Sequence, residues 1–193
     1  MRNVFAIFAL VLTASLSPGA LLAETPSSAA VAKAENPLQV LFSELKRERN
    51  EKAAERIASR IWDEWNKSGS SSVDLMMLWS QQAIEAKKYD VALDFLDQIV
   101  TLDPSYAEGW NRRATVHFLM QNYRKSMSDI EHTLELEPRH FGALSGMAQI
   151  MTATGRDELA LKAWQRVLDI YPMLRNAQNE VSRLSEELAG EGI

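Results

Sequence analysis

Three histidines, His117, His132 and His140, are the side chains of this sequence best suited to hold a metal ion or to transfer a proton near neutral pH. They lie in different expected elements, and none of them stands in an H-x-x-x-H arrangement, which would place two ligands on one face of a helix. The chain has no cysteine, so it offers no thiolate ligand, no thiol nucleophile and no disulfide. We therefore expect neither a metal site nor a cofactor.

Arg113 and His117 are the one pair of residues with potential for site chemistry, because they lie four positions apart and share a helix face. One interpretation is a polar binding pocket, or the titratable cluster of an enzyme. The other is structural: the arginine lays its methylenes over the core and meets a carboxylate from an adjacent helix, and a backbone carbonyl satisfies the histidine. We favour the structural interpretation and expect that the protein is not an enzyme.

The elements that position these residues repeat along the chain. Pro104, Pro138 and Pro172 stand 34 residues apart, and the hydrophobic pattern between them repeats in register. One column at this spacing is large and apolar, and a second is small: Phe42, Met76, Trp110 and Leu144; Ser80, Ala114 and Ala148. A bulky side chain of one helix packs over a small one of the next. This period predicts an all-α solenoid of antiparallel helix pairs, with Trp110 and Trp164 buried between units.

The second unit reads Trp110-x-x-Arg113-Ala114-x-x-His117, followed by Ser126-x-x-x-Ile130 and Pro138. In these residues the chain resembles the tetratricopeptide-repeat (TPR) family, whose layout is W-x-x-L-G-x-x-Y, A-x-x-x-F and P. Matching residues occur in the flanking units: Met76, Trp79, Ser80, Ala83, Ala92, Leu96 and Pro104; Leu144, Met147, Ala148, Met151, Ala160, Trp164 and Pro172. The resemblance implies three TPR units, over residues 73–106, 107–140 and 141–172.

Weaker signals extend the array in both directions. Phe42, Leu45, Ala58 and Trp62 keep the phase, so we expect a degenerate N-terminal helix pair over residues 37–72, atypical because one side of a terminal repeat faces water. After Pro172, apolar residues recur at spacings of four, three and four: Ala177, Val181, Leu184 and Leu188. They predict a capping helix over residues 173–189, followed by a tail over residues 190–193.

Residues 1–23 have the pattern of a secretory signal peptide. Arg2 precedes an apolar run from Val4 to Leu16, and Ser17-Pro18-Gly19 interrupts the chain before Ala23, where we expect cleavage. Residues 24–36 form a low-complexity tether. The sequence thus predicts a periplasmic or secreted protein with no integral membrane span after cleavage. An uncleaved signal that anchors the protein is the alternative.

Charge narrows the range of partners. The formal net charge is −5, which disfavours binding to nucleic acid and to anionic lipid. Basic residues do cluster over residues 46–60, but glutamates alternate with them at helical spacing. This segment therefore reads as a solvated helix face with ion pairs at i,i+4 spacing.

In the TPR family, the first helix of each unit lines a concave groove that binds an extended or helical peptide. The positions that match this groove are Met77, Gln81, Asn111, Arg112, Thr115, Phe118 and Gln149. The resemblance implies an adaptor that binds a protein or peptide partner. Arg112, next to Asn111, is the one hint of the basic clamp that grips chaperone tails, so we do not expect a chaperone-tail co-chaperone.

A structural subunit of an envelope assembly is the alternative function. Such a subunit would stack through its repeats without capturing a peptide. A large exposed apolar area outside the groove would favour it. The oligomeric state stays open at this stage.

Overall fold

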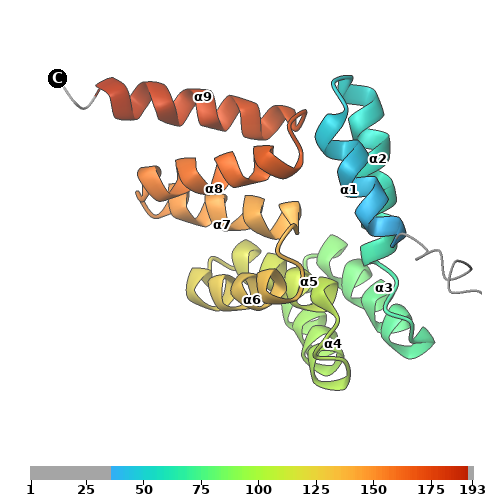
Figure 1. Cartoon of the computed structure of the whole chain (residues 1–193). Coiled ribbons are helices and arrows are strands. Elements are labelled where there is room, and N and C mark those ends of the chain that lie inside the picture. The colour runs from blue at the N-terminus through green and yellow to red at the C-terminus, as the bar shows by residue number, and fades with distance from the viewer. Residues whose placement is uncertain (1–35, 191–193) are drawn as a thin grey trace, which may run out of the picture. The chain divides into compact units, whose positions relative to one another are not determined.

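The computed structural model describes residues 36–190. Over this range the chain forms nine α-helices and no strand (Figure 1). Their bounds are Pro37–Arg47 (α1), Glu51–Trp65 (α2), Ser71–Glu85 (α3), Tyr89–Leu102 (α4), Ala107–Leu119 (α5), Tyr123–Leu136 (α6), Phe141–Ala153 (α7), Asp157–Ile170 (α8) and Arg175–Gly190 (α9). The expected all-α solenoid is confirmed. The signal peptide, residues 24–35 of the tether and residues 191–193 lie outside the described residues.

The turn inside each repeat recurs with the same period as the prolines. Lys87, Gln121 and Gly155 lie 34 residues apart, and each has a positive φ, of 56°, 60° and 67°. In each case the next residue donates its backbone N–H to a carbonyl five positions earlier, as Asn122 does to His117 at 2.8 Å. This is the hydrogen bond that closes a helix through one left-handed residue. It turns the chain so that the second helix packs back on the first.

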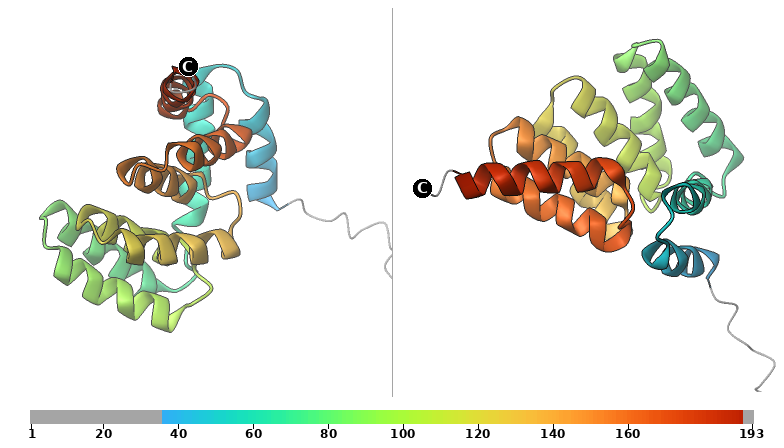
Figure 2. Two further views of the ribbon diagram at one scale, coloured as in Figure 1. Left: turned by 90° about the vertical axis from the view of Figure 1, so that its left-hand side faces the viewer. Right: turned by 90° about the horizontal axis from the view of Figure 1, so that it is seen from above.

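Helices α3 to α9 form one continuous stack (Figure 2), in which each helix packs against the next along the chain. The small columns lie at the crossings, where Ser80, Ala114 and Ala148 are fully buried. Trp164 is buried as expected. The same expectation is wrong for Trp110, which is half-buried: its Nε1 donates to the carbonyl oxygen of Pro104 at 2.9 Å, at the rim of α5. The indole N–H of Trp110 therefore has a hydrogen-bond partner although the ring is not enclosed in the core.

Helices α1 and α2 form a pair that does not continue this stack. They run across the ends of α7, α8 and α9 (Figures 1 and 2), and their apolar residues share one core with those three helices. Trp62 meets Phe141 edge-on with ring centroids 5.5 Å apart, and Arg175 forms an ion pair with Glu51 at 2.6 Å. The pair therefore keeps the phase of the repeat in sequence but buries its apolar face elsewhere.

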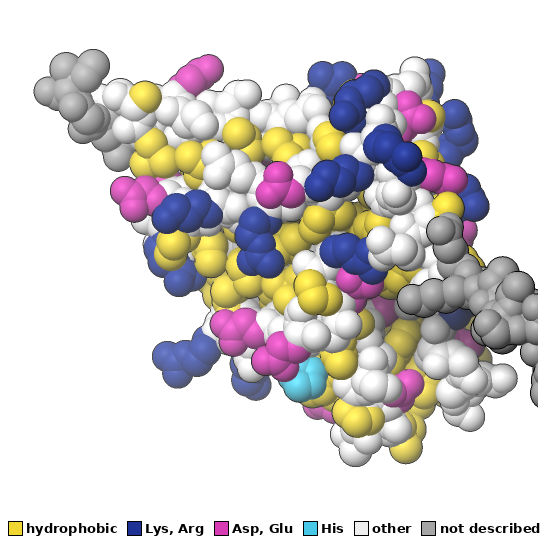
Figure 3. Space-filling view, viewed as in Figure 1, with side chains coloured by type: hydrophobic (Ala, Val, Ile, Leu, Met, Phe, Trp, Pro, Cys, Tyr) yellow, Lys and Arg dark blue, Asp and Glu magenta, His cyan; other side chains and the backbone are white. Residues whose placement is uncertain are grey.

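The surface of α1 and α2 carries many Lys and Arg side chains with acidic ones among them (Figure 3). Lys67 pairs with Glu64 at 2.6 Å, and Arg60 lies 3.7 Å from Glu44.

Among residues 36–190, no helix is both long and apolar enough to cross a membrane.

Candidate functional site

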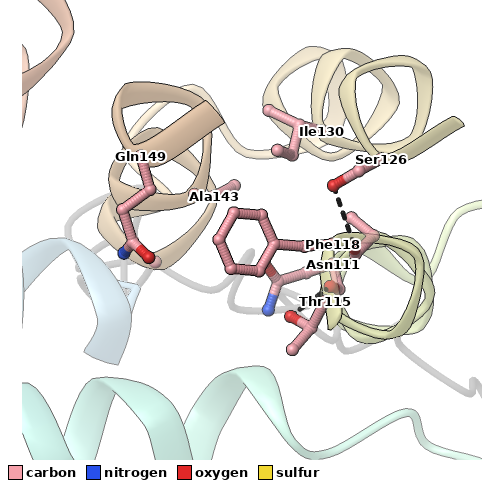
Figure 4. Close-up of a pocket in the computed structure, with 10 residues that line it drawn as sticks. Asn111, Thr115, Phe118, Ser126, Ile130, Ala143 and Gln149 are labelled. Carbon is pink, nitrogen blue, oxygen red and sulfur yellow. Dashed lines mark hydrogen bonds between the residues drawn. The ribbon is translucent and has the colours of Figure 1, made fainter. Parts of the chain in front are cut away.

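A pocket of about 140 Å³ opens between α5, α6 and α7 (Figure 4). Asn111, Thr115 and Phe118 reach it from α5 because spacings of four and three keep them on one helix face. Ser126 and Ile130 of α6 form its inner wall. On α7 the lining residues are mostly small, and Gln149 stands at the edge: Gly142, Ala143, Gly146 and Gln149. The small residues of α7 leave the space that the pocket occupies.

Hydrogen bonds within the protein fix several polar groups of the pocket. Ser126 donates its hydroxyl to the Ala114 carbonyl at 2.8 Å, and Thr115 donates its hydroxyl to the Asn111 carbonyl at 3.0 Å. The Asn111 amide donates through Nδ2 to Glu108 at 2.8 Å. Phe118 is half-buried, whereas Thr115 and Gln149 are exposed. The pocket thus combines an aromatic wall with uncharged polar groups, and no charged side chain of residues 36–190 lines it.

A buried polar network lies behind Asn111. Glu108 and His140 are both buried, and Nε2 of His140 lies 3.2 Å from Oε2 of Glu108. The backbone N–H of Ala143 donates to Nδ1 of His140 at 3.1 Å, which assigns the ring proton to Nε2. Burial acts to raise the pKa of Glu108, but the hydrogen bond from His140 and the nearby charge of Arg112 outweigh it, and the pKa is lowered. Glu108 is therefore an anion that organises three side chains around it.

The second helix of the N-terminal pair closes this network from outside. The ring of Trp65 stacks on His140 with centroids 4.0 Å apart and planes 10° apart, and Trp62 meets the same ring edge-on at 5.3 Å. The pairing of Glu108 with His140 was not predicted from the sequence. One signal was present: His140 lies 34 residues after Tyr106, which is also buried, so both occupy one aromatic column that precedes a first helix.

The structure brings four of the seven expected groove residues together at the pocket, namely Asn111, Thr115, Phe118 and Gln149. Arg112 and Gln81 lie elsewhere and bind each other at 2.6 Å. Arg112 also pairs with Glu108 at 3.0 Å and with Asn66 at 3.3 Å, so its guanidinium is engaged within the protein.

Met77, the seventh expected groove residue, differs from the expectation of an exposed contact. It is buried in the core around α3 and α4. With only 7% of its surface exposed, its side chain offers little contact to a peptide.

Arg113 takes the structural role that we favoured. Its guanidinium forms two hydrogen bonds to Asp129 of α6, at 2.8 and 2.7 Å, and a third to Asp97 of α4 at 2.8 Å. His117 is buried, and its Nδ1 has no hydrogen-bond partner in the described part of the chain, contrary to the expected backbone contact. Desolvation lowers the pKa of His117. Among the described residues, no group of three or more histidine and acidic side chains could hold a metal ion.

Comparison with known proteins starts from sequence. No family model matches the chain. A TPR repeat-containing protein of Rhizobium etli, RHE_CH03534.1, is 60% identical over 153 residues, which cover 79% of this chain and 75% of that protein. The small glutamine-rich tetratricopeptide repeat-containing protein 2 of Saccharomyces cerevisiae is 27% identical over 61% of this chain and 34% of its own length.

Solved structures with a similar fold include TPR domains, as the related sequences do. The first TPR domain of Spaghetti (RPAP3), bound to an HSP90 peptide, superposes with a TM-score of 0.58 at 25% identity, over 61% of this chain and 93% of that domain. MamA shares the fold with a TM-score of 0.57, over 72% of this chain and 81% of its own. With the repeat columns, the stacked helix pairs and a relative at 60% identity, the chain belongs to the TPR-repeat protein family.

Proposed function

We propose that this protein is a non-enzymatic adaptor that binds an extended segment of a partner protein in the pocket between α5, α6 and α7. The observation that carries the proposal is the convergence of Asn111, Thr115, Phe118 and Gln149 on one open pocket. Peptide binding by the Spaghetti (RPAP3) TPR domain supports it, because that domain has the same fold.

The lining of the pocket indicates the chemistry of the bound segment. Phe118 offers an aromatic contact, and Thr115 and Gln149 offer hydrogen bonds without charge. We propose that the segment places a small apolar side chain beside Phe118 and pairs its backbone with the polar edge. A volume of about 140 Å³ fits a side chain of modest size.

Binding of an HSP90 peptide, as in the Spaghetti (RPAP3) structure, is not part of the proposal for this chain. Arg112 is the one cation among the expected groove residues, and Glu108, Gln81 and Asn66 already bind its guanidinium. Among the described residues, no cation that could bind an acidic peptide tail lines the pocket.

We also propose that the adaptor works outside the cytoplasm. The support is the sequence of residues 1–23, which have the basic start, apolar run, break and small residue of a secretory signal. Expression of the full chain in a Gram-negative host, followed by cell fractionation and N-terminal sequencing, tests this. A periplasmic product that begins near Glu24 is expected, and an intact N-terminus in the membrane fraction would favour the anchored alternative.

Partner capture with matched variants tests the binding proposal. The wild type, Asn111→Ala with Phe118→Ala, and a control with Arg124→Ala and Lys125→Ala are used as baits in parallel. Circular dichroism checks that each bait is folded, because Asn111 also binds the buried Glu108. The pocket variant should retain at least tenfold less partner, about 1.4 kcal/mol. Both control residues are exposed in the first turn of α6, so capture by this variant should stay within about twofold of the wild type, since exposed charges contribute little. Loss with the control and retention with the pocket variant would place the partner on the outer edge instead.

A second candidate function is a structural subunit of an assembly. One observation favours it: α3 and α4 expose several large apolar side chains away from the pocket. Its test is the size of the native complex. A structural subunit should be found in a stable large assembly in cell extract and be poorly soluble without it.

A further inference from the structure

One end of the helix stack exposes an apolar surface that no part of residues 36–190 covers. We define the α3–α4 face by its exposed side chains: Leu75, Leu78 and Trp79 of α3, and Val91 and Leu102 of α4. Their exposed fractions are 44%, 52%, 41%, 43% and 67%. Trp79 packs on Phe95 with ring centroids 5.5 Å apart, and a hollow of about 420 Å³ lies beside them. The face is thus both apolar and indented.

The repeat pattern indicates that this face is suited to burial. Trp79 stands in the column of Leu45 and Met147, which are fully and partly buried. In a regular array the preceding helix pair would cover α3. Here that pair, α1 and α2, packs on α7 to α9 instead, and α3 forms the outer edge of the stack (Figure 2, right). The position that a preceding repeat would fill is therefore open.

We propose that the α3–α4 face binds the same face of a second copy of this chain, which makes a two-fold symmetric dimer. Area supports this occupant. The five exposed side chains supply on the order of a few hundred Å² of apolar surface, the size of patch that marks an interaction site. The flanking Gln82, Ala86, Lys88 and Phe95 extend the face toward the roughly 800 Å² per partner of a stable interface.

The distribution of charge favours this face over other surfaces for self-association. The chain carries a formal net charge of −5, so two copies repel each other across most surfaces. The five residues that define the face are uncharged, and Lys88 is the one charged residue that lines its hollow. An interface that is apolar and nearly uncharged in its centre is typical of homodimers.

At the far end of the stack, residues 175–190 offer no matching surface for end-to-end association. Helix α9 buries Ala177 and Leu184 against the core. It also carries ion pairs on its surface, where Arg183 meets Glu180 and Glu187, each at 2.7 Å. A head-to-tail contact would place this charged helix on the apolar face. The self-complementary contact is therefore the favoured one.

Sedimentation equilibrium of the purified protein, expressed from the full-length chain, tests the proposal. A dimer is expected at micromolar concentration. Leu75→Asp should weaken it at least tenfold, because a charge is then buried at the interface. Leu159→Asp is the matched control, since Leu159 of α8 is also 44% exposed but lies outside the face, and it should leave the dimer unchanged within about twofold. Circular dichroism checks that each variant is folded.

Cross-linking gives a second readout that does not depend on a destabilising charge. The chain has no cysteine, so Leu78→Cys introduces a single thiol. Under mild oxidation this variant should form covalent dimers, and Leu159→Cys should not. A wild-type monomer at micromolar concentration would overturn the proposal, even if the face binds another protein. A dimer that survives Leu75→Asp and gives no Leu78→Cys cross-link would equally overturn it. Neither result bears on binding in the pocket between α5, α6 and α7, so the adaptor proposal is tested independently.

Discussion

Gly142→Ala tests the unusual placement of the N-terminal helix pair against α7. A Cβ atom at Gly142 would lie 2.6 Å from Cη2 and 2.9 Å from Cζ2 of Trp62. Both contacts are with the rigid indole ring, which is held between Trp65, His140 and Phe141. The ring or α7 must therefore move to admit one methyl group.

Two opposing terms set the size of the effect. Overpacking a well-packed contact costs about 1–3 kcal/mol. Replacing glycine by alanine in a helix interior returns up to about 1 kcal/mol, and less here because Gly142 is the second residue of α7. We expect a net loss of about 1–2 kcal/mol in the free energy of unfolding, or a Tm lower by about 2–8 °C for a domain of this size.

Gly146→Ala is the matched control in the same helix. Its Cβ would meet Cδ1 of Ile130 at 3.4 Å, an ordinary contact, so the helix should gain up to about 1 kcal/mol. Thermal and urea unfolding of the two variants give the comparison. If Gly142→Ala were as stable as Gly146→Ala, then Trp62 would not pack on α7, and the position of α1 and α2 described here would be wrong.

Three further predictions concern the repeats. Trp164→Ala should cost about 3–5 kcal/mol in urea unfolding, because the side chain is fully buried, whereas Trp110→Ala should cost clearly less. Asp129→Asn should cost about 2–3 kcal/mol, below the range for a fully broken buried pair, since Asp97 still holds Arg113; a silent variant would show that this pair adds nothing to stability. Desolvation lowers the folded-state pKa of His117, so the contribution of His117 to stability is complete above pH ~6.5 and is lost as the pH falls through the folded-state pKa. The variant His117→Tyr should therefore show a Tm that changes less with pH in that window. An unchanged dependence of Tm on pH would contradict the lowered pKa of His117.

The periodic part of the fold could be predicted because each repeat imposes the same local demands. Large and small side chains alternate at helix crossings, so the positions of Ala114 and Ala148 in the sequence indicate where two helices pack closely. The structure adds that Lys87, Gln121 and Gly155 share a left-handed turn. Only Gly155 is a residue type that commonly adopts a positive φ, so the same turn at Lys87 and Gln121 could not be predicted from residue type.

The remainder could not be predicted because it depends on contacts between elements far apart in the chain. Leu45 and Trp62 keep the repeat phase, but phase records which face of a helix is apolar and not which partner covers it. Buried Glu108 binds His140, 32 residues away, and the ring of His140 stacks on Trp65 of a helix outside the repeats. The same displacement of α1 and α2 leaves Trp79 exposed.

The affinity of the captured partner for wild type and for Phe118→Ala, measured by titration calorimetry, shows whether the pocket between α5, α6 and α7 binds that partner. Phe118 is preferable to Asn111 as the single site, because Asn111 also supports buried Glu108 and its loss perturbs the protein itself. A dissociation constant at least tenfold higher is expected for Phe118→Ala, with the variant still folded by circular dichroism. Equal affinities for the two proteins would contradict the claim that the pocket between α5, α6 and α7 binds the partner.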